Sequence, residues 1–327
     1  MMQILAFSRP ACTMGSGIVR MSLALISGGS GLIGTALARS LLVRGHRVVI
    51  LTRNSTKQPT YGESVVWDGI HPGPWMDWIG KADWVVNLAG ENIGAKPWTE
   101  RRWQEIRESR VFPGELLTEA VIRSPVRPST FLQMSAIGYY GIQSPSDKSS
   151  WDETTPPGND RLANLCKEWE SSSAKLESHN VRRLIIRTGL VLSHRGGVLP
   201  RLVLPYRFFI GGSLGGGRQI YSWIHLDDLV QGMLFLLENP EARGLYNLTS
   251  PQPVTQHEFG CMIGRVLRRP HWISVPAIII KLILGEMSTL VLDGQRVLPA
   301  RLLRDTTFQF AFPSIESALA NIYQNRI

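Results

Sequence analysis

The segment from Gly28 to Gly34 has the residue types and the spacing of a phosphate-binding turn. It follows the apolar run Ser22–Ser27 and leads into the apolar-periodic stretch Leu32–Val43. Glycine permits a tight turn at Gly28, a close approach of phosphate at Gly31, and close packing of helix on strand at Gly34. The N–H groups at the start of the helix would then bind the pyrophosphate of a dinucleotide. The expected contacts are Gly28, Ser30, Gly31, Leu32, Ile33 and Gly34.

The end of the second expected strand, at residues 47–51, indicates which dinucleotide binds. An Asp or Glu at this point would bond the ribose 2′-hydroxyl of NAD. The sequence instead has Thr52 and Arg53, and no acid occurs before Glu63. Arg53 offers a planar pair of donors to a 2′-phosphate, and Thr52 adds a hydroxyl. A solvated loop arginine is the alternative, but the pattern favours NADP, as NADPH or its oxidised form.

The elements that must position this turn alternate along the chain. Buried strands are expected at 22–27, 47–51, 82–88, 130–135 and 183–187, with helices near 32–43, 98–118 and 162–178. Strands that alternate with helices predict an α/β fold, in which a parallel sheet is covered on both faces. Together with the glycine turn, this order predicts a doubly wound sheet of the Rossmann type.

The pattern divides the chain into three parts. Residues 21–250 form the expected Rossmann domain, and after them the pattern becomes mainly helical, which predicts a small C-terminal lobe at 251–327. Residues 1–20 contain two arginines and no acid, which is compatible with an organelle transit peptide. They are equally compatible with an early start codon, because Met21 opens the first strand directly. We expect a cytoplasmic protein, or a mitochondrial or chloroplast one if residues 1–20 are a transit peptide.

Composition excludes several classes of protein. Apolar residues make up 43% of the chain and charged residues 19%, which excludes global disorder. The net charge is +9, but the basic residues are scattered, so a phosphorylated cofactor is a simpler anionic partner than nucleic acid.

Cys12, Cys166 and Cys261 are too widely spaced for a disulfide framework or a metal knuckle, so we expect no metal. The apolar stretch 275–292 contains two charges, which favours a buried helical segment over a membrane span.

Further motifs lie at the ends of the expected strands and beyond them. They are NLAG at 87–90, GENI at 90–93, GYYG at 138–141, RTGLVL at 187–192, WIHLDD at 223–228 and GQRVLP at 294–299. With these motifs the chain resembles the extended short-chain dehydrogenase/reductase superfamily. Within it, the chain is similar to an atypical epimerase-like family of the NAD-dependent epimerase/dehydratase type, often labelled as cell-division inhibitor homologues. The resemblance covers nearly the whole chain from Met21 and includes a small C-terminal domain of unknown function.

The resemblance implies cofactor contacts on two sides of the dinucleotide. Leu88, Ala89 and Gly90 stand where the fourth strand of the family ends and would line the adenosine side. Val191 follows the strand that usually meets the nicotinamide. These residues belong to the motifs that carry the resemblance.

Three charged residues are implied in the same way. Asp68 stands where such proteins often contact adenine, with an exposed loop acid as the alternative. Glu105 and Arg110 lie on the next helix and would face the ribose and phosphates, with a solvated helix face as the alternative.

Related reductases use a Tyr-x-x-x-Lys pair, in which the Tyr hydroxyl passes a proton and the Lys lowers its pKa and holds the ribose. This chain lacks that pair. Lys167 is present in the expected helix, but Ala163 stands four residues before it. Lys167 is therefore either a ribose contact or a surface helix charge.

The remaining candidates for acid–base work are Ser135, Tyr139, Tyr140 and His225. In the family pattern the active hydroxyl precedes the Tyr-Gly pair by four residues, a position held here by Ala136. Ser135 lies one step earlier, and a shift of one residue on a strand turns the side chain to the other face. A packed aromatic pair is the alternative for the two tyrosines, and a structural hydrogen bond is the alternative for the histidine.

These observations lead to two hypotheses. The first is an NADP(H)-dependent oxidoreductase or epimerase-like enzyme that acts on a small molecule at an atypical active site. The second is a regulator that senses NADP(H) and catalyses nothing, a reading favoured by the missing Tyr-x-x-x-Lys pair. No nucleic acid or membrane partner is expected, and the sequence leaves a monomer and a homodimer open.

Overall fold

The computed structural model describes residues 21–53, 59–144 and 146–323, and a seven-stranded parallel sheet lies at its centre. The strand order is β11-β6-β5-β4-β1-β2-β3. The strands are β1 (Leu23–Ser27), β2 (Arg47–Thr52), β3 (Glu63–Val66), β4 (Trp84–Asn87), β5 (Thr130–Ala136), β6 (Arg182–Thr188) and β11 (Gly244–Leu248). This order confirms the predicted Rossmann sheet, with its switch point between β1 and β4. The expected leader at 1–20 lies outside the described residues.

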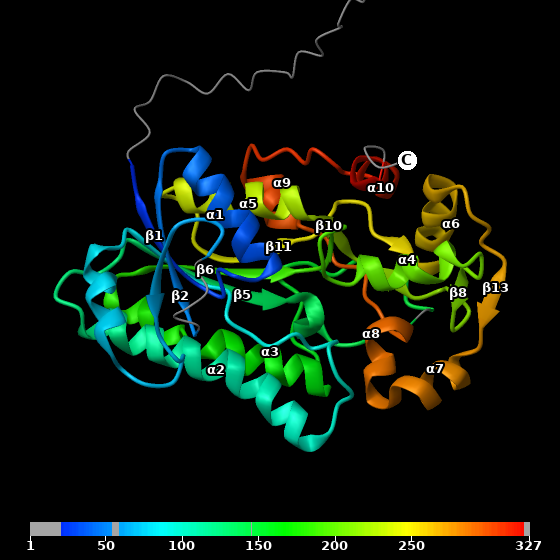
Figure 1. The fold of residues 1–327 in the computed structure, drawn as a ribbon, viewed down its shortest axis with the longest axis horizontal. Coiled ribbons are helices and arrows are strands. Elements are labelled where there is room, and N and C mark those ends of the chain that lie inside the picture. Colours follow the sequence, from blue (N-terminus) through cyan, green and yellow to red (C-terminus); the bar gives the residue numbers. More distant parts are fainter. Residues whose placement is uncertain (1–20, 54–58, 145, 324–327) are drawn as a thin grey trace, which may run out of the picture.

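Helices cover both faces of the sheet (Figure 1). On one face lie α1 (Leu32–Val43) and α5 (Leu226–Glu238), and on the other lie α2 (Glu100–Arg123) and α3 (Arg161–Ser171). Strand residues alternate between the two cores, as the pleat requires. In β1, Ile26 packs in the core that contains α1, whereas Leu25 packs in the core that contains α2. Both faces are apolar, which explains why the strands are continuous apolar runs in the sequence.

A smaller lobe is built from two separate stretches of the chain. It contains α4 (Leu199–Arg207), α6 (Gln256–Leu267) and α10 (Ile315–Tyr323), and its strand pairs are β7 (Leu190–Leu192) with β10 (Trp223–His225), β9 (Ile220–Tyr221) with β12 (Val254–Thr255), and β8 (Gly212–Leu214) with β13 (Ile273–Val275). Val203, Phe259 and Leu319 share its core. The lobe therefore combines residues 190–225 with the C-terminal residues, which do not pack as a body of their own.

The remaining elements are short. They are η1 (Pro74–Lys81), η2 (Ile137–Tyr140), η3 (Ala174–His179), α7 (Ala277–Leu284), η4 (Gly285–Ser288), α8 (Thr289–Leu292) and α9 (Ala300–Asp305). The expectation of a buried helical segment at 275–292 is wrong for α7, where Leu282 is 79% exposed and Ile283 is 74% exposed. Across the described part of the chain, no helix has both the length and the apolar character needed to cross a membrane.

Candidate functional site

The glycine turn between β1 and α1 has the steric requirements that its spacing indicated. Gly28 has a φ of +68°, and a Cβ atom there would lie 2.5 Å from the carbonyl oxygen of Leu88. A Cβ on Gly34 would lie 2.5 Å from the carbonyl oxygen of Gly28. A Cβ on Gly31 would meet that same oxygen at 3.3 Å, so this position is less crowded by protein. Gly31 is the N-cap of α1 and has no side chain to cap it, so the first N–H groups of α1 face outward at the turn.

A cavity of about 630 Å³ opens beside this turn at the carboxyl ends of β1, β2 and β4. We call it the glycine-turn cavity. About half of its lining residues are ones that the sequence indicated, and several of the others lie on α2. Its lining comprises Gly28, Ser30, Gly31, Leu51, Thr52, Arg53, Trp67, Asp68, Gly69, Ile70, Leu88, Ala89, Gly90, Glu91, Lys96, Arg102, Glu105, Glu108, Ser109, Phe112 and Pro113. Leu32, Ile33 and Val191 pack together with Leu88 against the adjoining core.

Three basic side chains line this cavity. Arg53 has a side chain that is 75% exposed, and its Nη2 lies 3.4 Å from Oε1 of Glu91. Arg102 is nearly buried and bonds the other oxygen of Glu91 at 3.3 Å. Lys96 also lines the cavity. Arg102 is shared between Glu91 and Glu105, whereas Arg53 is mostly exposed and has only a 3.4 Å contact with Glu91, so Arg53 is the cation best placed to bind an added anionic group.

Asp68 and Glu105 line the same cavity but are already engaged with protein groups. Asp68 accepts hydrogen bonds of 2.8 Å from the backbone N–H groups of Ile70 and His71. These bonds hold the pKa of its carboxyl well below the usual range. Glu105 pairs with Arg102 at 3.1 Å, and this hydrogen bond lowers the pKa of its carboxyl. Both acids therefore stay charged, and both shape the wall of the cavity.

Arg110 separates this cavity from a second one. Its buried guanidinium donates to the carbonyl oxygens of Ile106 and Glu91, each at 2.9 Å, and lies over the ring of Trp169. Burial lowers its pKa to about 10. A Cβ on Gly90 would lie 3.2 Å from its central carbon. Arg110 thus supports the loop after β4 from behind and faces the second cavity rather than the glycine-turn cavity.

The second cavity has a volume of about 290 Å³ and mostly apolar walls. We call it the apolar cavity. It lies among the carboxyl ends of β5 and β6, helix α3 and the segment around α8. Its lining comprises Ile93, Arg110, Ala136, Ile137, Gly138, Gly141, Ile142, Asp160, Leu162, Leu165, Cys166, Trp169, Thr188, Gly189, Leu190, Ile220, Tyr221, Ser222, Thr289, Leu290, Asp293, Gly294 and Gln295.

Ser135 does not face the apolar cavity. It is fully buried, and its hydroxyl donates to Oε1 of Glu170 at 2.7 Å. Glu170 in turn accepts two hydrogen bonds from Arg187, at 2.7 and 2.8 Å. Ala136, the next residue along β5, lines the cavity instead. The alternation of the strand therefore places the hydroxyl in a buried ion-pair cluster beneath α3.

The two tyrosines belong to the wall behind the cavity. Tyr140 is buried, and its hydroxyl donates to Oδ1 of Asn247 at 2.8 Å. Burial raises the pKa of this hydroxyl to about 12. The ring of Tyr139 lies edge-on to that of Tyr140, and the guanidinium carbon of Arg187 lies 3.2 Å from the Tyr139 ring centre. Neither tyrosine is among the residues that line the apolar cavity.

His225 and Lys167 also have structural partners. Nδ1 of His225 accepts from the backbone N–H of Asp227 at 3.1 Å and so caps α5. Burial lowers the pKa of His225. Nζ of Lys167 lies 3.4 Å from the carbonyl oxygen of Gly158, and Ala163 is fully buried. Neither His225 nor Lys167 is part of the described lining of the two cavities.

Comparisons with known proteins agree with this geometry. Residues 24–249 match the family described as the NAD dependent epimerase/dehydratase family, and residues 275–322 match a domain of unknown function (DUF1731). The chain belongs to the epimerase/dehydratase family. The resemblance that the sequence motifs indicated is thereby confirmed.

The relatives cover almost the whole chain. The Arabidopsis thaliana chloroplastic homologue of epimerase family protein SDR39U1 is 36% identical over 304 residues, which are 91% of this chain and 86% of that protein. Epimerase family protein YfhF of Bacillus subtilis is 35% identical over 92% of this chain and 98% of its own length. The crystal structure of human SDR39U1 with NADPH is 32% identical, with a TM-score of 0.83 over 93% of this chain and 99% of that chain.

Sequence reasoning missed most polar groups of the apolar cavity in this family member. Gln295 lies in the GQRVLP motif, and its amide donates to the carbonyl oxygens of Ile137 and Gly141 at 3.1 Å each. Asp293 accepts a 2.6 Å hydrogen bond from Thr289. Cys166 is buried, which raises the pKa of its thiol to about 12. The motif was a usable signal for Gln295, whereas nothing in the sequence marked Cys166 or Asp293.

Proposed function

We propose that the protein binds NADPH in the glycine-turn cavity and transfers hydride to a small, largely apolar molecule held in the apolar cavity. One observation carries this proposal: a single loop after β4 borders both cavities. Glu91 in that loop lines the first, and Ile93, two residues later, lines the second. A cofactor that lies along this loop would bring its reactive end next to the second cavity, as ligands do at the switch point of such sheets.

The proposal of NADPH rather than NADH rests on charge. No acid stands at the end of β2 in the sequence, where a ribose 2′-hydroxyl would be recognised, and Arg53 directly follows this strand in the cavity wall. The human relative was crystallised with NADPH. When bound, the cofactor would supply the hydride, while the N-terminus of α1 and the glycine turn hold its phosphates.

The walls of the apolar cavity bear on the class of acceptor. Hydride addition to an aldehyde or ketone forms an alkoxide, which needs a positioned acid for protonation. Ser135, Tyr140 and His225 are held by other partners, as described above. Reduction of a quinone instead forms a phenolate-type anion, comparable in basicity to tyrosinate with its pKa of about 10, which takes a proton from water. We therefore favour a quinone-like acceptor over a simple carbonyl.

The test is a screen of quinones, aldehydes and ketones that follows the loss of NADPH absorbance. Ile142, half exposed at the rim of the apolar cavity, provides a variant that fills it. We expect Ile142→Trp to lower kcat/KM for any acceptor about 10-fold or more while NADPH affinity stays unchanged. Ile210→Trp is the matched control, because Ile210 is equally exposed and lines neither described cavity. Equal effects of the two substitutions would refute the assignment of this cavity to the substrate.

A second candidate function is a sensor of NADP(H). The observation that favours it is the lack of a proton donor among the sequence-predicted residues at the apolar cavity. A sensor would bind NADPH and NADP with different shapes or partners, without turnover. Full occupancy by NADPH together with no oxidation in the screen, and a change in small-angle scattering between the two redox forms, would favour this reading over the enzyme.

A further inference from the structure

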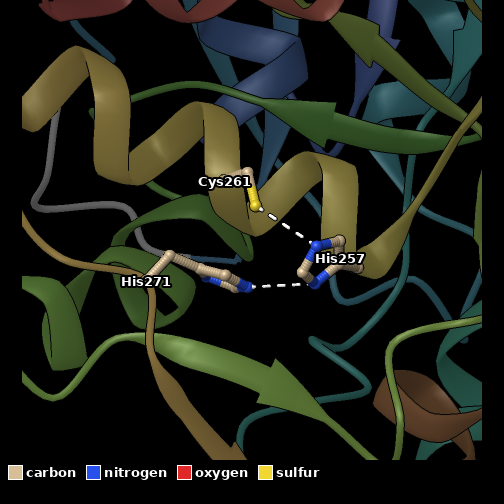
Figure 2. A group of neighbouring side chains, drawn as sticks. All are labelled: His257, Cys261 and His271. Carbon is tan, nitrogen blue, oxygen red and sulfur yellow. Dashed lines mark hydrogen bonds between the residues drawn. The ribbon is translucent and has the colours of Figure 1, made fainter.

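Three side chains with metal-binding groups meet on the small lobe, outside the lining of both cavities. His257 and Cys261 lie on α6, and His271 lies in the segment that leads from α6 to β13. Figure 2 shows the three side chains pointing toward one another. Sγ of Cys261 lies 3.5 Å from Nε2 of His257, and Nε2 of His271 lies 3.3 Å from Nδ1 of His257. One ligand atom from each residue falls within 4.8 Å of the others.

Two glycines allow His271 to reach this position. His257 and Cys261 are four residues apart, so they share one face of α6. Gly260 and Gly264 leave a gap in the side-chain cover of α6 where the later segment passes. A Cβ on Gly260 would lie 2.4 Å from Cε1 of His271, and one on Gly264 would lie 2.7 Å from the carbonyl oxygen of Arg269. The close approach of His271 is therefore built into the helix.

The orientation of His271 is fixed from its other side. Its Nδ1 lies 2.8 Å from the hydroxyl of Tyr206, and the two rings are stacked with 13° between their planes. This bond directs Nε2 toward His257, and metal-binding histidines usually have such a partner on the second nitrogen. Oγ of Ser213, on β8, lies 2.9 Å from Nδ1 of His257 and 3.2 Å from Nε2 of His271. An oxygen therefore stands beside the two histidines.

We propose that His257, Cys261 and His271 bind a Zn²⁺ ion, with a water beside the Ser213 hydroxyl at the fourth position. Imidazole and thiolate donors select Zn²⁺ over Mg²⁺ or Ca²⁺. With Zn–N and Zn–S bonds of about 2.0–2.3 Å, tetrahedral ligand atoms are about 3.3–3.8 Å apart. The contacts of His257 with Cys261 and His271, at 3.5 and 3.3 Å, fall in this range but use opposite nitrogens of its ring, so the ring must turn to bind the ion through one of them. His257 and Cys261 are both exposed, so the ring of His257 has room to direct one nitrogen at the shared centre.

Binding has a defined chemical balance and a structural consequence. The S–H bond of Cys261 breaks, its proton passes to solvent, and a Zn–S bond forms without any change in oxidation state. The ion would cross-link α6 to the segment before β13, and through β13 to β8. The spacing of the three cysteines could not indicate this site, because two of its ligands are histidines and one of them lies on another segment.

The test is a titration of the reduced full-length chain with Co²⁺, followed by displacement with Zn²⁺. A Cys12→Ser background removes the thiol outside the described residues. We expect one equivalent of Co²⁺ to produce a thiolate-to-cobalt charge-transfer band. Cys261→Ser should abolish this band and weaken Zn²⁺ binding by about 100-fold or more, at least the loss seen when a supporting group of a metal site is removed. Zn²⁺ should raise the Tm of the parent but not of Cys261→Ser.

Two controls keep the outcome decisive. His179→Gln changes a half-exposed histidine elsewhere and should leave Co²⁺ and Zn²⁺ binding unchanged. His271→Gln keeps a polar group opposite Tyr206 and should weaken Zn²⁺ binding as Cys261→Ser does. Circular dichroism checks that each variant is folded. A parent protein without the charge-transfer band, or Zn²⁺ affinity that is equal in the parent and Cys261→Ser, would overturn the proposal.

Discussion

Arg53 is the residue on which we expect the choice between the two nicotinamide cofactors to depend. Its guanidinium touches Glu91 only at 3.4 Å, so a 2′-phosphate could take its place. We expect Arg53→Ala to weaken NADPH binding about 10-fold or more, the worth of a charge-assisted hydrogen bond. NADH binding should change little, because NADH lacks the 2′-phosphate. Calorimetric titration with both dinucleotides measures this difference.

The control for this prediction is Arg123→Ala. Arg123 is also exposed and ion-paired, but it lies at the far end of α2 and does not line the glycine-turn cavity. It should leave both affinities unchanged. An equal loss of NADPH and NADH affinity in Arg53→Ala would move the discrimination to Thr52 or Lys96.

Ser135 provides a second test at the residue scale, because its surroundings predict a structural effect. Ser135→Ala removes one hydrogen bond to Glu170, which remains bonded to Arg187. We expect the free energy of unfolding to fall by about 1 kcal/mol. Glu170→Ala would leave Arg187 buried without its partner and should cost about 3–5 kcal/mol. Urea denaturation measures both, and NADPH affinity should be unchanged in Ser135→Ala. A loss of turnover in Ser135→Ala at unchanged stability would instead make the hydroxyl catalytic.

At the scale of elements, local pattern was a good guide to strands and a poor guide to where single side chains point. The apolar runs of β1, β2 and β6 were recognisable because both faces of each strand are buried. Because both faces are buried, the sequence does not show toward which face of the sheet a given side chain points. Ser135 and Ala136 were distinguishable only through the family spacing, and the structure places Ala136 at the cavity. The sequence thus predicts which strand ends border the site, but not which side chains face it.

Substitutions in the turn between β1 and α1 should separate effects on cofactor binding from effects on folding, because we expect its glycines to be required for different reasons. Gly31 has a φ of −76°, which any residue adopts, and its Cβ position is only moderately crowded. Gly31→Val should therefore fold normally and lose NADPH binding, because the branched side chain fills the phosphate position. A Cβ on Gly34 would collide with the backbone at Gly28 and Gly29. Gly34→Ala should lower the free energy of unfolding by about 1–3 kcal/mol.

Calorimetry and thermal melting distinguish these two outcomes. The expected result is a normal Tm with no NADPH binding for Gly31→Val, and a lowered Tm for Gly34→Ala. If Gly31→Val binds NADPH with the affinity of the parent, the dinucleotide does not lie on this turn. If Gly34→Ala has the same Tm as the parent, α1 packs on β1 less tightly than the structure indicates.

At the scale of the whole molecule, the Rossmann sheet was predictable and the interleaving of the small lobe was not. The sheet follows from short-range alternation of strands and helices. The pairing of β8 with β13 joins residues about sixty positions apart, and no local pattern records it. The segment after α9 likewise returns to the Rossmann half, where Phe308 and Phe310 pack against its core. The C-terminal residues therefore hold the two halves together.

This attachment of the C-terminal segment makes the stability of the whole molecule depend on pH. Asp228 accepts hydrogen bonds from the backbone N–H groups of Ala311 and Phe312, at 2.8 and 2.9 Å, and the ring of His225 lies 4.2 Å from that of Phe312. Burial lowers the pKa of His225, so the unfolded chain binds a proton at this residue more readily than the folded one. The contribution of His225 to the free energy of unfolding should thus be fully present above about pH 6.5. It should fall as the pH drops from there toward the lowered pKa of His225 in the folded protein.

The pKa shifts of two other buried groups show which residues can cause the loss of stability in acid. Burial raises the pKa of Asp228, so the folded state binds that proton more readily, and its titration cannot cause a loss of stability on acidification. His271 is also shifted downward by burial and adds to the same trend. His225→Asn keeps a good N-cap for α5 and removes one titrating ring, so urea denaturation between about pH 5 and 7 should show a shallower slope than in the parent. His271→Gln should make the remaining slope shallower, whereas the control His179→Gln should keep the parental curve. A parental slope in His225→Asn would mean that acid weakens the molecule at some other group.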